Sequence, residues 1–216
     1  MWRGCIARRN TNLELGREKN QVKQLMILIL AGCFSSKGLP DVANEDWERD
    51  GQLVIDDFNQ DTIGRWQFVS DQVMGGVSDG KVTLEQDEGM YYARLTGNVS
   101  TKNYGGFIQL RTGISFANSE QGGKNLQGVR INVRGNGETY NFHIVTNDRA
   151  YYGDFYSATF QADSEWKMIE FPFNTFERKG YNTSKLDAKN IRSIAIVAYG
   201  RDFISDVSVS TIEFFY

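Results

Sequence analysis

The sequence has little of the residue types that build metal sites and disulfide frameworks. One of its 216 residues is histidine, His143, and its two cysteines, Cys5 and Cys33, both lie near the N-terminus. The chain beyond residue 33 therefore contains no disulfide and no cysteine metal site. A single histidine also excludes sites that need several imidazoles. We expect no cofactor and no bound metal, and a fold that is stabilised by packing alone.

Negative charge predominates beyond the N-terminal segment. Residues 1–32 carry six basic and two acidic side chains, so the remaining residues have a net charge of −7, against −3 for the whole chain. A domain of this sign repels phosphate backbones, and no basic stripe with interleaved aromatics is present, so we expect no nucleic-acid partner. Proline is scarce (2), whereas glycine (22) and aromatic residues (13%) are abundant. This balance is typical of short strands joined by glycine turns.

A short apolar segment near the N-terminus resembles a bacterial lipoprotein signal. Lys23 precedes seven apolar residues, 25–31, which are too few to span a bilayer but suit a secretory signal. Leu30-Ala31-Gly32-Cys33 resembles a lipobox, in which the cysteine thiol receives a diacylglycerol. The alternative is a short buried segment with a chance cysteine. We expect lipidation of Cys33 and an anchor in the cell envelope, on the periplasmic face of the outer membrane, since Phe34 rather than Asp follows.

Three regions are predicted along the chain. Residues 1–33 form an N-terminal extension and lipoprotein-type signal, residues 34–50 a polar tether, and residues 51–216 a single folded domain. Residues 1–21 have mixed charge and fit a signal poorly, which indicates that translation starts at Val22, read as methionine. The domain itself is expected to contact the membrane only through the lipid anchor.

The domain has the alternation of apolar and polar residues that half-buried strands require. Val129, Ile131 and Val133 alternate with polar residues, and the Gly135-Asn136-Gly137 turn leads into a second alternating segment, 140–145. We predict that these two segments form a β-hairpin. Further strands are predicted at Gly51–Phe58, Lys81–Glu85, Met90–Gly97, Gly106–Arg111, Phe155–Gln161, Glu165–Phe171, Ile191–Tyr199 and Val207–Phe215. The pattern indicates an antiparallel sandwich or barrel, with one helical turn at residues 186–190.

Two motifs contain paired glycines. The first is Asp71-Gln72-Val73-Met74-Gly75-Gly76-Val77-Ser78, which follows Trp66; the second is Asn103-Tyr104-Gly105-Gly106-Phe107. Both resemble, in order and spacing, the signature of the complex I intermediate-associated protein family. The resemblance implies an all-β, galactose-binding-domain-like jelly-roll β-sandwich over residues 53–215. Mitochondrial members act as chaperones in assembling NADH:ubiquinone oxidoreductase, so it also implies a protein partner, with respiratory complex subunits as candidates.

The paired glycines have two interpretations. Glycines permit positive φ, and the polar side chains of Asp71 and Ser78 can cap backbone donors of the turn, which explains the motif without a ligand. Alternatively, the turn holds Met74 at a rigid tip, where methionine offers an adaptable apolar contact. The candidate partner-binding residues are Asp71, Met74, Gly75, Gly76, Ser78, Tyr104, Gly105 and Gly106.

No arrangement diagnostic of catalysis is found, and we predict no enzymatic activity. Carboxylates such as Asp56 and Glu170 lack the spacing of a glycosidase pair, and a strand position makes His143 a packed or solvent-facing residue rather than a base. The alternative function is that of a carbohydrate-binding module, in which aromatic rings stack on sugar faces and polar groups bind hydroxyls. Its candidate residues are Arg134, Tyr151, Tyr152 and Tyr156, although the alternation of Tyr156 with Ala158 and Phe160 also fits a core strand.

Overall fold

The computed structural model describes residues 48–49, 52–116, 125–180 and 184–216. The predicted signal with Cys33, and nearly all of the tether, lie outside these residues. The strands are β1 (Glu48–Arg49), β2 (Gln52–Asp56), β3 (Gln67–Ser70), β4 (Asp79–Asp87), β5 (Met90–Val99), β6 (Phe107–Gly113), β7 (Gly128–Gly135), β8 (Thr139–Thr146), β9 (Phe155–Gln161), β10 (Lys167–Pro172), β11 (Glu177–Lys179), β12 (Ile191–Tyr199) and β13 (Phe203–Phe215). Short 3-10 turns connect them: η2 (Ile63–Arg65), η3 (Asp71–Met74), η4 (Lys102–Tyr104), η5 (Phe173–Thr175) and η6 (Ala188–Asn190).

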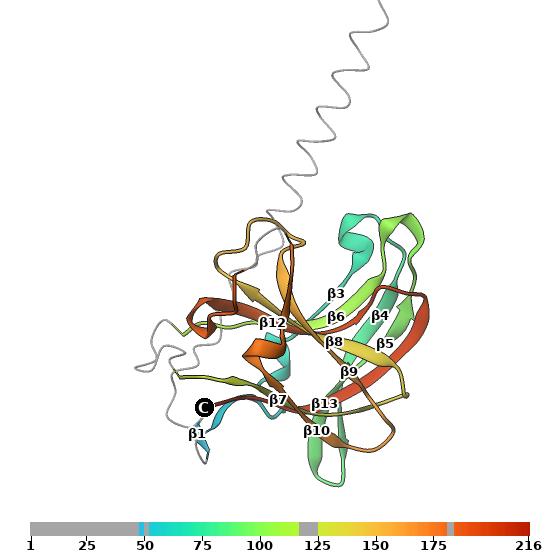
Figure 1. Cartoon of the computed structure of the whole chain (residues 1–216). Coiled ribbons are helices and arrows are strands. Elements are labelled where there is room, and N and C mark those ends of the chain that lie inside the picture. Colours follow the sequence, from blue (N-terminus) through green and yellow to red (C-terminus); the bar gives the residue numbers. More distant parts are fainter. Residues whose placement is uncertain (1–47, 50–51, 117–124, 181–183) are drawn as a thin grey trace, which may run out of the picture. The chain divides into compact units, whose positions relative to one another are not determined.

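The strands form two antiparallel sheets (Figure 1). In the seven-stranded sheet the order is β1-β2-β13-β5-β4, and β7 pairs with both β13 and β10. In the six-stranded sheet the order is β11-β9-β8-β12-β6-β3. This is the all-β sandwich that the alternating pattern predicts. Within the described part of the chain, no helix has the length and apolar character needed to cross a membrane.

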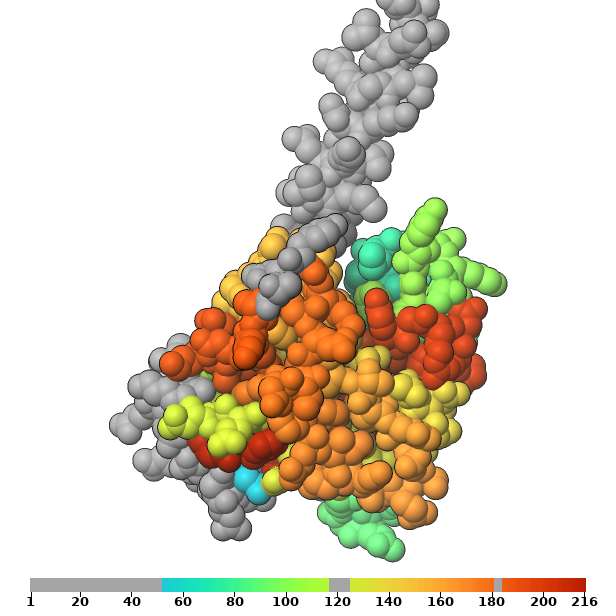
Figure 2. Space-filling view, in the orientation of Figure 1, coloured from blue at the N-terminus to red at the C-terminus, as the bar shows by residue number. Residues whose placement is uncertain are grey.

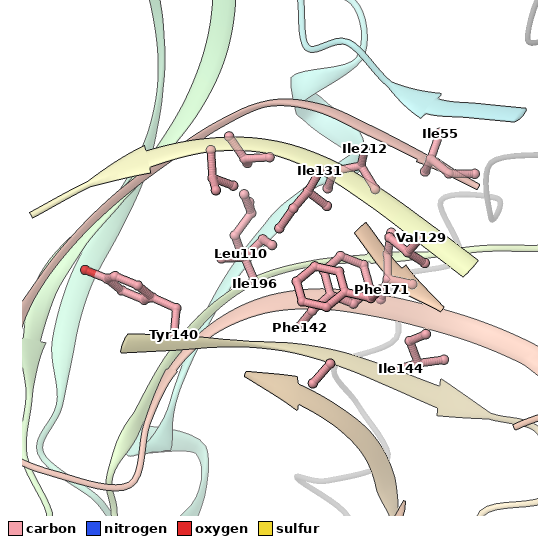
Figure 3. Close-up of a cluster of buried hydrophobic side chains, with 14 of the residues drawn as sticks. Ile55, Leu110, Val129, Ile131, Tyr140, Phe142, Ile144, Phe171, Ile196 and Ile212 are labelled. Carbon is pink, nitrogen blue, oxygen red and sulfur yellow. The ribbon is translucent and has the colours of Figure 1, made fainter. Parts of the chain in front are cut away.

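The core lies between the two sheets (Figure 3). Ile131 of β7 and Phe142 of β8 come from opposite sheets, and both side chains are fully buried. The hydroxyl of Tyr140 points away from the other labelled side chains in Figure 3. It donates to Oδ1 of Asn136 (2.7 Å) and accepts from the backbone of Asp206 (2.9 Å). The ring therefore fills the core while its polar end is satisfied at the margin.

The predicted hairpin of residues 129–134 and 140–145 is wrong. β7 pairs with β10 and β13, whereas β8 pairs with β9 and β12, so the connection crosses from one sheet to the other. The loop between them is held by other segments: Gly135 N donates to Asp163 O, and Gly137 N donates to Ala162 O. The apolar side chains of β7 and β8 face each other across the core. Strands in facing sheets and strands in a hairpin show the same alternation, so the sequence pattern does not distinguish the two arrangements.

The other predicted strands are present, and the turn predicted at residues 186–190 is η6. The sequence analysis missed β1, β3 and β11, which have only two to four residues each. Segments this short show no measurable periodicity, because a period of two needs several repeats to stand out.

Candidate functional site

The carboxylate of Asp71 joins the two glycine motifs. Its Oδ1 accepts a hydrogen bond from Ser78 N (2.9 Å), and its Oδ2 accepts from Ser78 Oγ (2.5 Å). The same Oδ2 accepts from the backbone amides of Gly106 (2.5 Å) and Phe107 (3.2 Å). Burial opposes ionisation of this side chain, but these hydrogen bonds outweigh it and hold the pKa of Asp71 below its ordinary value. A buried anion thus ties the first motif to the second.

The glycines are explained by this carboxylate. Gly75 ends η3 in the left-handed region, at φ +91°, where L side chains are strained. A Cβ on Gly76 would lie 2.3 Å from the carboxyl carbon of Asp71, and a Cβ on Gly105 would lie 2.4 Å from its Oδ2. Both motifs therefore need glycine because the backbone passes directly against the buried carboxylate.

Apolar side chains project from the two motifs. We call the side chains of Val73, Met74, Val77 and Tyr104 the apolar tip; they are 57%, 56%, 45% and 98% exposed. The segments that carry them, coloured teal and light green, project at the upper right of Figure 2. Asn103 and Tyr104 have φ of +56° and +60°, a conformation that costs free energy in non-glycine residues and concentrates at functional sites. The structure holds an exposed tyrosine on a strained backbone.

The partner-binding candidates thus divide into two groups. Asp71 and Ser78 are fully buried, and Ser78 Oγ also accepts from the backbone of Ser100 (2.9 Å). These side chains, with the glycines, form the support. Met74 and Tyr104 are the predicted residues whose side chains lie on the surface. Val73 and Val77 were not among the candidates, although both lie inside the first motif.

The outer face of the six-stranded sheet is a second candidate site. An open hollow of about 780 Å³ is lined by outward-facing residues of β8, β9 and β12, Asn141, Phe155, Ser157, Thr159 and Tyr199 among them, and also by Ile169, Glu170 and Phe171 of β10 in the other sheet. The residues of β8 and β9 named here are the outward-facing half of the alternation whose other half forms the core. The alternation alone does not predict a site on this face, because a solvated face and a ligand-binding face have the same period.

The sequence also matches a known protein family. The family model described as Complex I intermediate-associated protein 30 matches residues 56–206. The chain belongs to this family. No individual curated protein matches its sequence.

Several solved structures share the fold of this family member. The family 11 carbohydrate-binding module from Clostridium thermocellum, solved with a β-1,3-1,4-mixed-linked tetrasaccharide, has a TM-score of 0.59 and 18% identity over 78% of this chain and 97% of the module. The family 11 module of a cellulosomal cellulase from the same organism gives a TM-score of 0.60 at 18% identity, covering 78% and 96%. A family 30 module of a Clostridium thermocellum cellulase gives 0.50 at 11%, covering 69% and 90%. The likeness shows a jelly-roll β-sandwich, as predicted.

The saccharide candidates predicted for this family member are not brought together. Arg134 lies on the seven-stranded sheet, where it pairs with Asp87 (3.1 Å) and stacks over Trp166, 4.7 Å from the ring centroid. Tyr156 is 2% exposed and belongs to the core. Tyr151 and Tyr152 are 43% and 66% exposed in the loop between β8 and β9. Of the four, these two tyrosines are exposed, and their loop joins two strands of the six-stranded sheet.

Two buried carboxylates, Asp56 and Asp154, have structural roles. Asp56 is 1% exposed and accepts from Phe58 N (2.8 Å), Thr62 Oγ1 (2.7 Å) and Trp66 Nε1 (2.7 Å). Asp154 binds Arg178 in a bidentate pair of 2.7 and 2.8 Å. Within the described ranges, no cluster of three or more histidine, cysteine or acidic residues is placed to hold a metal ion.

Proposed function

We propose that this family member is a non-catalytic binding domain that captures a protein partner through the apolar tip. The main support for the proposal is the exposure of Met74 and Tyr104. Both side chains project from backbone that the buried carboxylate of Asp71 holds in place. Folding gains nothing from leaving such side chains in water, so a docking role explains their placement. The Asp71 network fixes the tip before binding, which reduces the entropy lost on association.

The family supplies the partner that we propose. Its name, and the chaperone role that the resemblance implies, point to subunits of NADH:ubiquinone oxidoreductase. Aromatic and methionine side chains suit the centre of a protein interface, because they bury a large area and adapt their shape. The lipid at Cys33 would keep the domain next to a membrane.

A pull-down from detergent-solubilised membranes tests this proposal. The wild-type chain is expected to retain complex I subunits, identified by mass spectrometry, and the Met74→Ala/Tyr104→Ala double variant is expected to lose them. Met168→Ala is the matched control, because Met168 is a comparably exposed methionine, 48% against 56%, on β10 of the seven-stranded sheet. Equal retention by the double variant would show that the tip does not dock a partner.

The second candidate function is saccharide binding on the outer face of the six-stranded sheet. It is favoured by the hollow between β8, β9, β10 and β12, whose lining combines the rings of Phe155 and Tyr199 with the polar groups of Asn141 and Thr159. Aromatic faces pack on sugar C–H groups while amides and hydroxyls bind the sugar hydroxyls. Two of the modules with the same fold carry family descriptions of carbohydrate binding, and one was solved with a tetrasaccharide. Retention of the chain by immobilised polysaccharide, unchanged in Met74→Ala/Tyr104→Ala, would favour this function.

A further inference from the structure

Arg111 occupies an unusual position on the outer face of the six-stranded sheet. It lies on β6, in register with Gln67 of β3 on one side and Ala195 of β12 on the other. Its side chain is half-buried, yet it forms no hydrogen bond or ion pair with any residue that the structure describes. A guanidinium that is partly removed from water without a partner is unfavourable, and buried arginines are ordinarily paired.

Two more arginines lie close to Arg111. Arg192 precedes Ser193, which pairs with Gly113 two residues beyond Arg111. Arg149 lies in the loop after β8, where its backbone N donates to Thr146 O (3.4 Å) and its guanidinium stacks 4.9 Å from the ring centroid of Tyr152. Burial, and then the positive charges of Arg149 and Arg192, lower the pKa of Arg111. The positive charges of Arg149 and Arg192 thus lie close enough to Arg111 to oppose its own charge.

The nearby carboxylates have other partners and form no ion pair with Arg111 in the described ranges. Asp148 and Asp154 belong to the same loop as Arg149, but both bind Arg178, at 3.1 and 2.7 Å. Glu177, on the edge strand β11, pairs with Lys179 at 2.8 Å. Asp154 also attracts Arg149, whereas Arg111 forms no ion pair with any described residue, so an external anion would gain most at Arg111.

A buried histidine on the same row provides a second, independent observation. His143 of β8 pairs in register with Ala195, so Ala195 alone separates it from Arg111. The ring is 9% exposed and stacks on Phe155 at a centroid distance of 4.3 Å. Its Nε2 is buried and has no hydrogen-bond partner in the described part of the chain. Buried polar atoms are ordinarily hydrogen-bonded, so this row of the outer face holds two polar side chains, His143 and Arg111, whose bonding capacity the described residues do not use.

We infer that the outer face of the six-stranded sheet binds an acidic saccharide, with Arg111 and Arg149 holding a sugar carboxylate. The fork of guanidinium donors matches a carboxylate in geometry and charge. Tyr199, 49% exposed, lies four residues beyond Ala195 on β12, about 13 Å along the strand. An oligosaccharide of three or more units can therefore reach both the arginines and this ring. The inference deepens the second candidate function and does not depend on the apolar tip.

Isothermal titration of the full chain with three probes tests the inference. Tri-galacturonate is expected to bind at least about tenfold more tightly than neutral cellotriose, because a charge-assisted hydrogen bond contributes about that factor. Its affinity is expected to fall as salt is raised, since screening weakens ionic contacts. Inorganic phosphate, the third probe, carries charge without the sugar ring and is expected to bind more weakly than tri-galacturonate.

Three single variants sharpen the test. Arg111→Gln is expected to lose about tenfold or more of the tri-galacturonate affinity, and Arg111→Lys part of it, because lysine lacks the bidentate fork. Lys81→Gln removes the same charge from exposed β4 and is expected to change nothing. Arg111→Gln is also expected to melt no lower than the wild type, because it removes an unpaired charge from among like charges. A purely structural role for Arg111 would instead lower its melting temperature.

Each of the other outcomes would overturn a defined part of the inference. Equal binding of cellotriose and tri-galacturonate, with no loss in Arg111→Gln, would overturn the acidic ligand and leave saccharide binding intact. Phosphate that binds as tightly as tri-galacturonate, and competes with it, would overturn the saccharide class in favour of a simple anion. Absence of binding by all three probes would overturn the inference, and retention on immobilised polysaccharide would then decide whether the second candidate function stands.

Discussion

The backbone amide of Gly106 donates a 2.5 Å hydrogen bond to Oδ2 of Asp71, across 35 residues of sequence. This contact connects the first glycine motif, which carries Met74, with the second, which carries Tyr104. At Gly76 and Gly105 the backbone passes so close to the same carboxylate that there is no room for a Cβ atom. A single buried anion therefore sets the separation of Met74 and Tyr104. The predicted function of the tip depends on this support.

Replacing the carboxylate tests the support directly. Asp71→Asn is expected to lower the free energy of unfolding by about 2–4 kcal/mol. Both carboxylate oxygens of Asp71 accept hydrogen bonds, whereas asparagine keeps one oxygen and its NH2 group can only donate. Asp202→Asn is the control; its carboxylate also binds a backbone amide, that of Thr101 (2.6 Å), but at an exposed site. Urea denaturation measures both variants. Equal losses would show that burial of the Asp71 network adds nothing.

The same variant should change the response to acid. The folded-state pKa of Asp71 lies below its ordinary value, so its contribution is present above the unfolded-state pKa and is lost as pH falls through the folded-state pKa. Below about pH 4 the wild type is therefore expected to lose stability more steeply with falling pH than Asp71→Asn does. Parallel pH profiles of the two proteins would contradict the depressed pKa.

Gly75 provides a test of backbone strain without steric overlap. Its φ is +91°, and a Cβ there would meet nothing within 4 Å. Gly75→Val is expected to cost about 1–3 kcal/mol of unfolding free energy, because a β-branched residue is strained at positive φ. Gly75→Asn is expected to cost clearly less, since asparagine tolerates the left-handed region. Similar losses in both variants, measured by chemical denaturation, would show that strain is not the cause.

The sequence predicted which residues face the core better than it predicted which strands pair. Alternation of Val129, Ile131 and Val133 reports one buried face, and these side chains are buried. It carries no information on the neighbouring strand, so β7 and β8, adjacent in sequence, were joined in a hairpin although they lie in opposite sheets. The separation of the two strands is fixed by the Gly135-Asn136-Gly137 loop, whose backbone N–H groups donate hydrogen bonds to segments far away along the chain.

The candidate sites were predictable to different degrees. Met74 and Tyr104 lie in motifs that glycine marks, so the sequence located the tip. Arg111 lies in a strand whose polar residues look like any solvated face, and only the folded chain shows that Asp148 and Asp154 bind Arg178 while Arg111 has no carboxylate partner among the described residues. Such competition among ion pairs is a property of the folded chain, and no local pattern records it.

The buried histidine predicts a second pH effect, in a higher range. Burial, assisted by the charge of Lys179, lowers the pKa of His143 to about 3, against about 6.5 in the unfolded chain. Between these values the unfolded state binds a proton that the folded state does not, so stability falls as pH falls. From pH 7 to pH 5 the wild type should lose stability, and His143→Gln should show a flatter profile. A steep profile in the variant would assign the effect to other groups.

The lipobox prediction concerns residues outside the described ranges and stands as a proposal. The wild-type chain is expected to partition into membranes and to carry the added mass of a diacylglyceryl group at Cys33. Cys33→Ala is expected to abolish both, because the thiol is the acceptor of the lipid. Fractionation and intact-mass spectrometry measure the two effects. Wild-type chain recovered unmodified in the cytosol would show that the N-terminal segment is not a lipoprotein signal.

Met74→Ala separates binding from folding at the tip. The side chain is 56% exposed, so its truncation is expected to change the free energy of unfolding by less than about 0.5 kcal/mol. Leu110→Ala, at a position that is 1% exposed, is expected to cost about 2–5 kcal/mol in the same urea titration. Partner capture, in contrast, is expected to fall in Met74→Ala although its stability is almost unchanged. A large loss of stability in Met74→Ala would place this side chain in the core, and the first glycine motif would then have a structural role only.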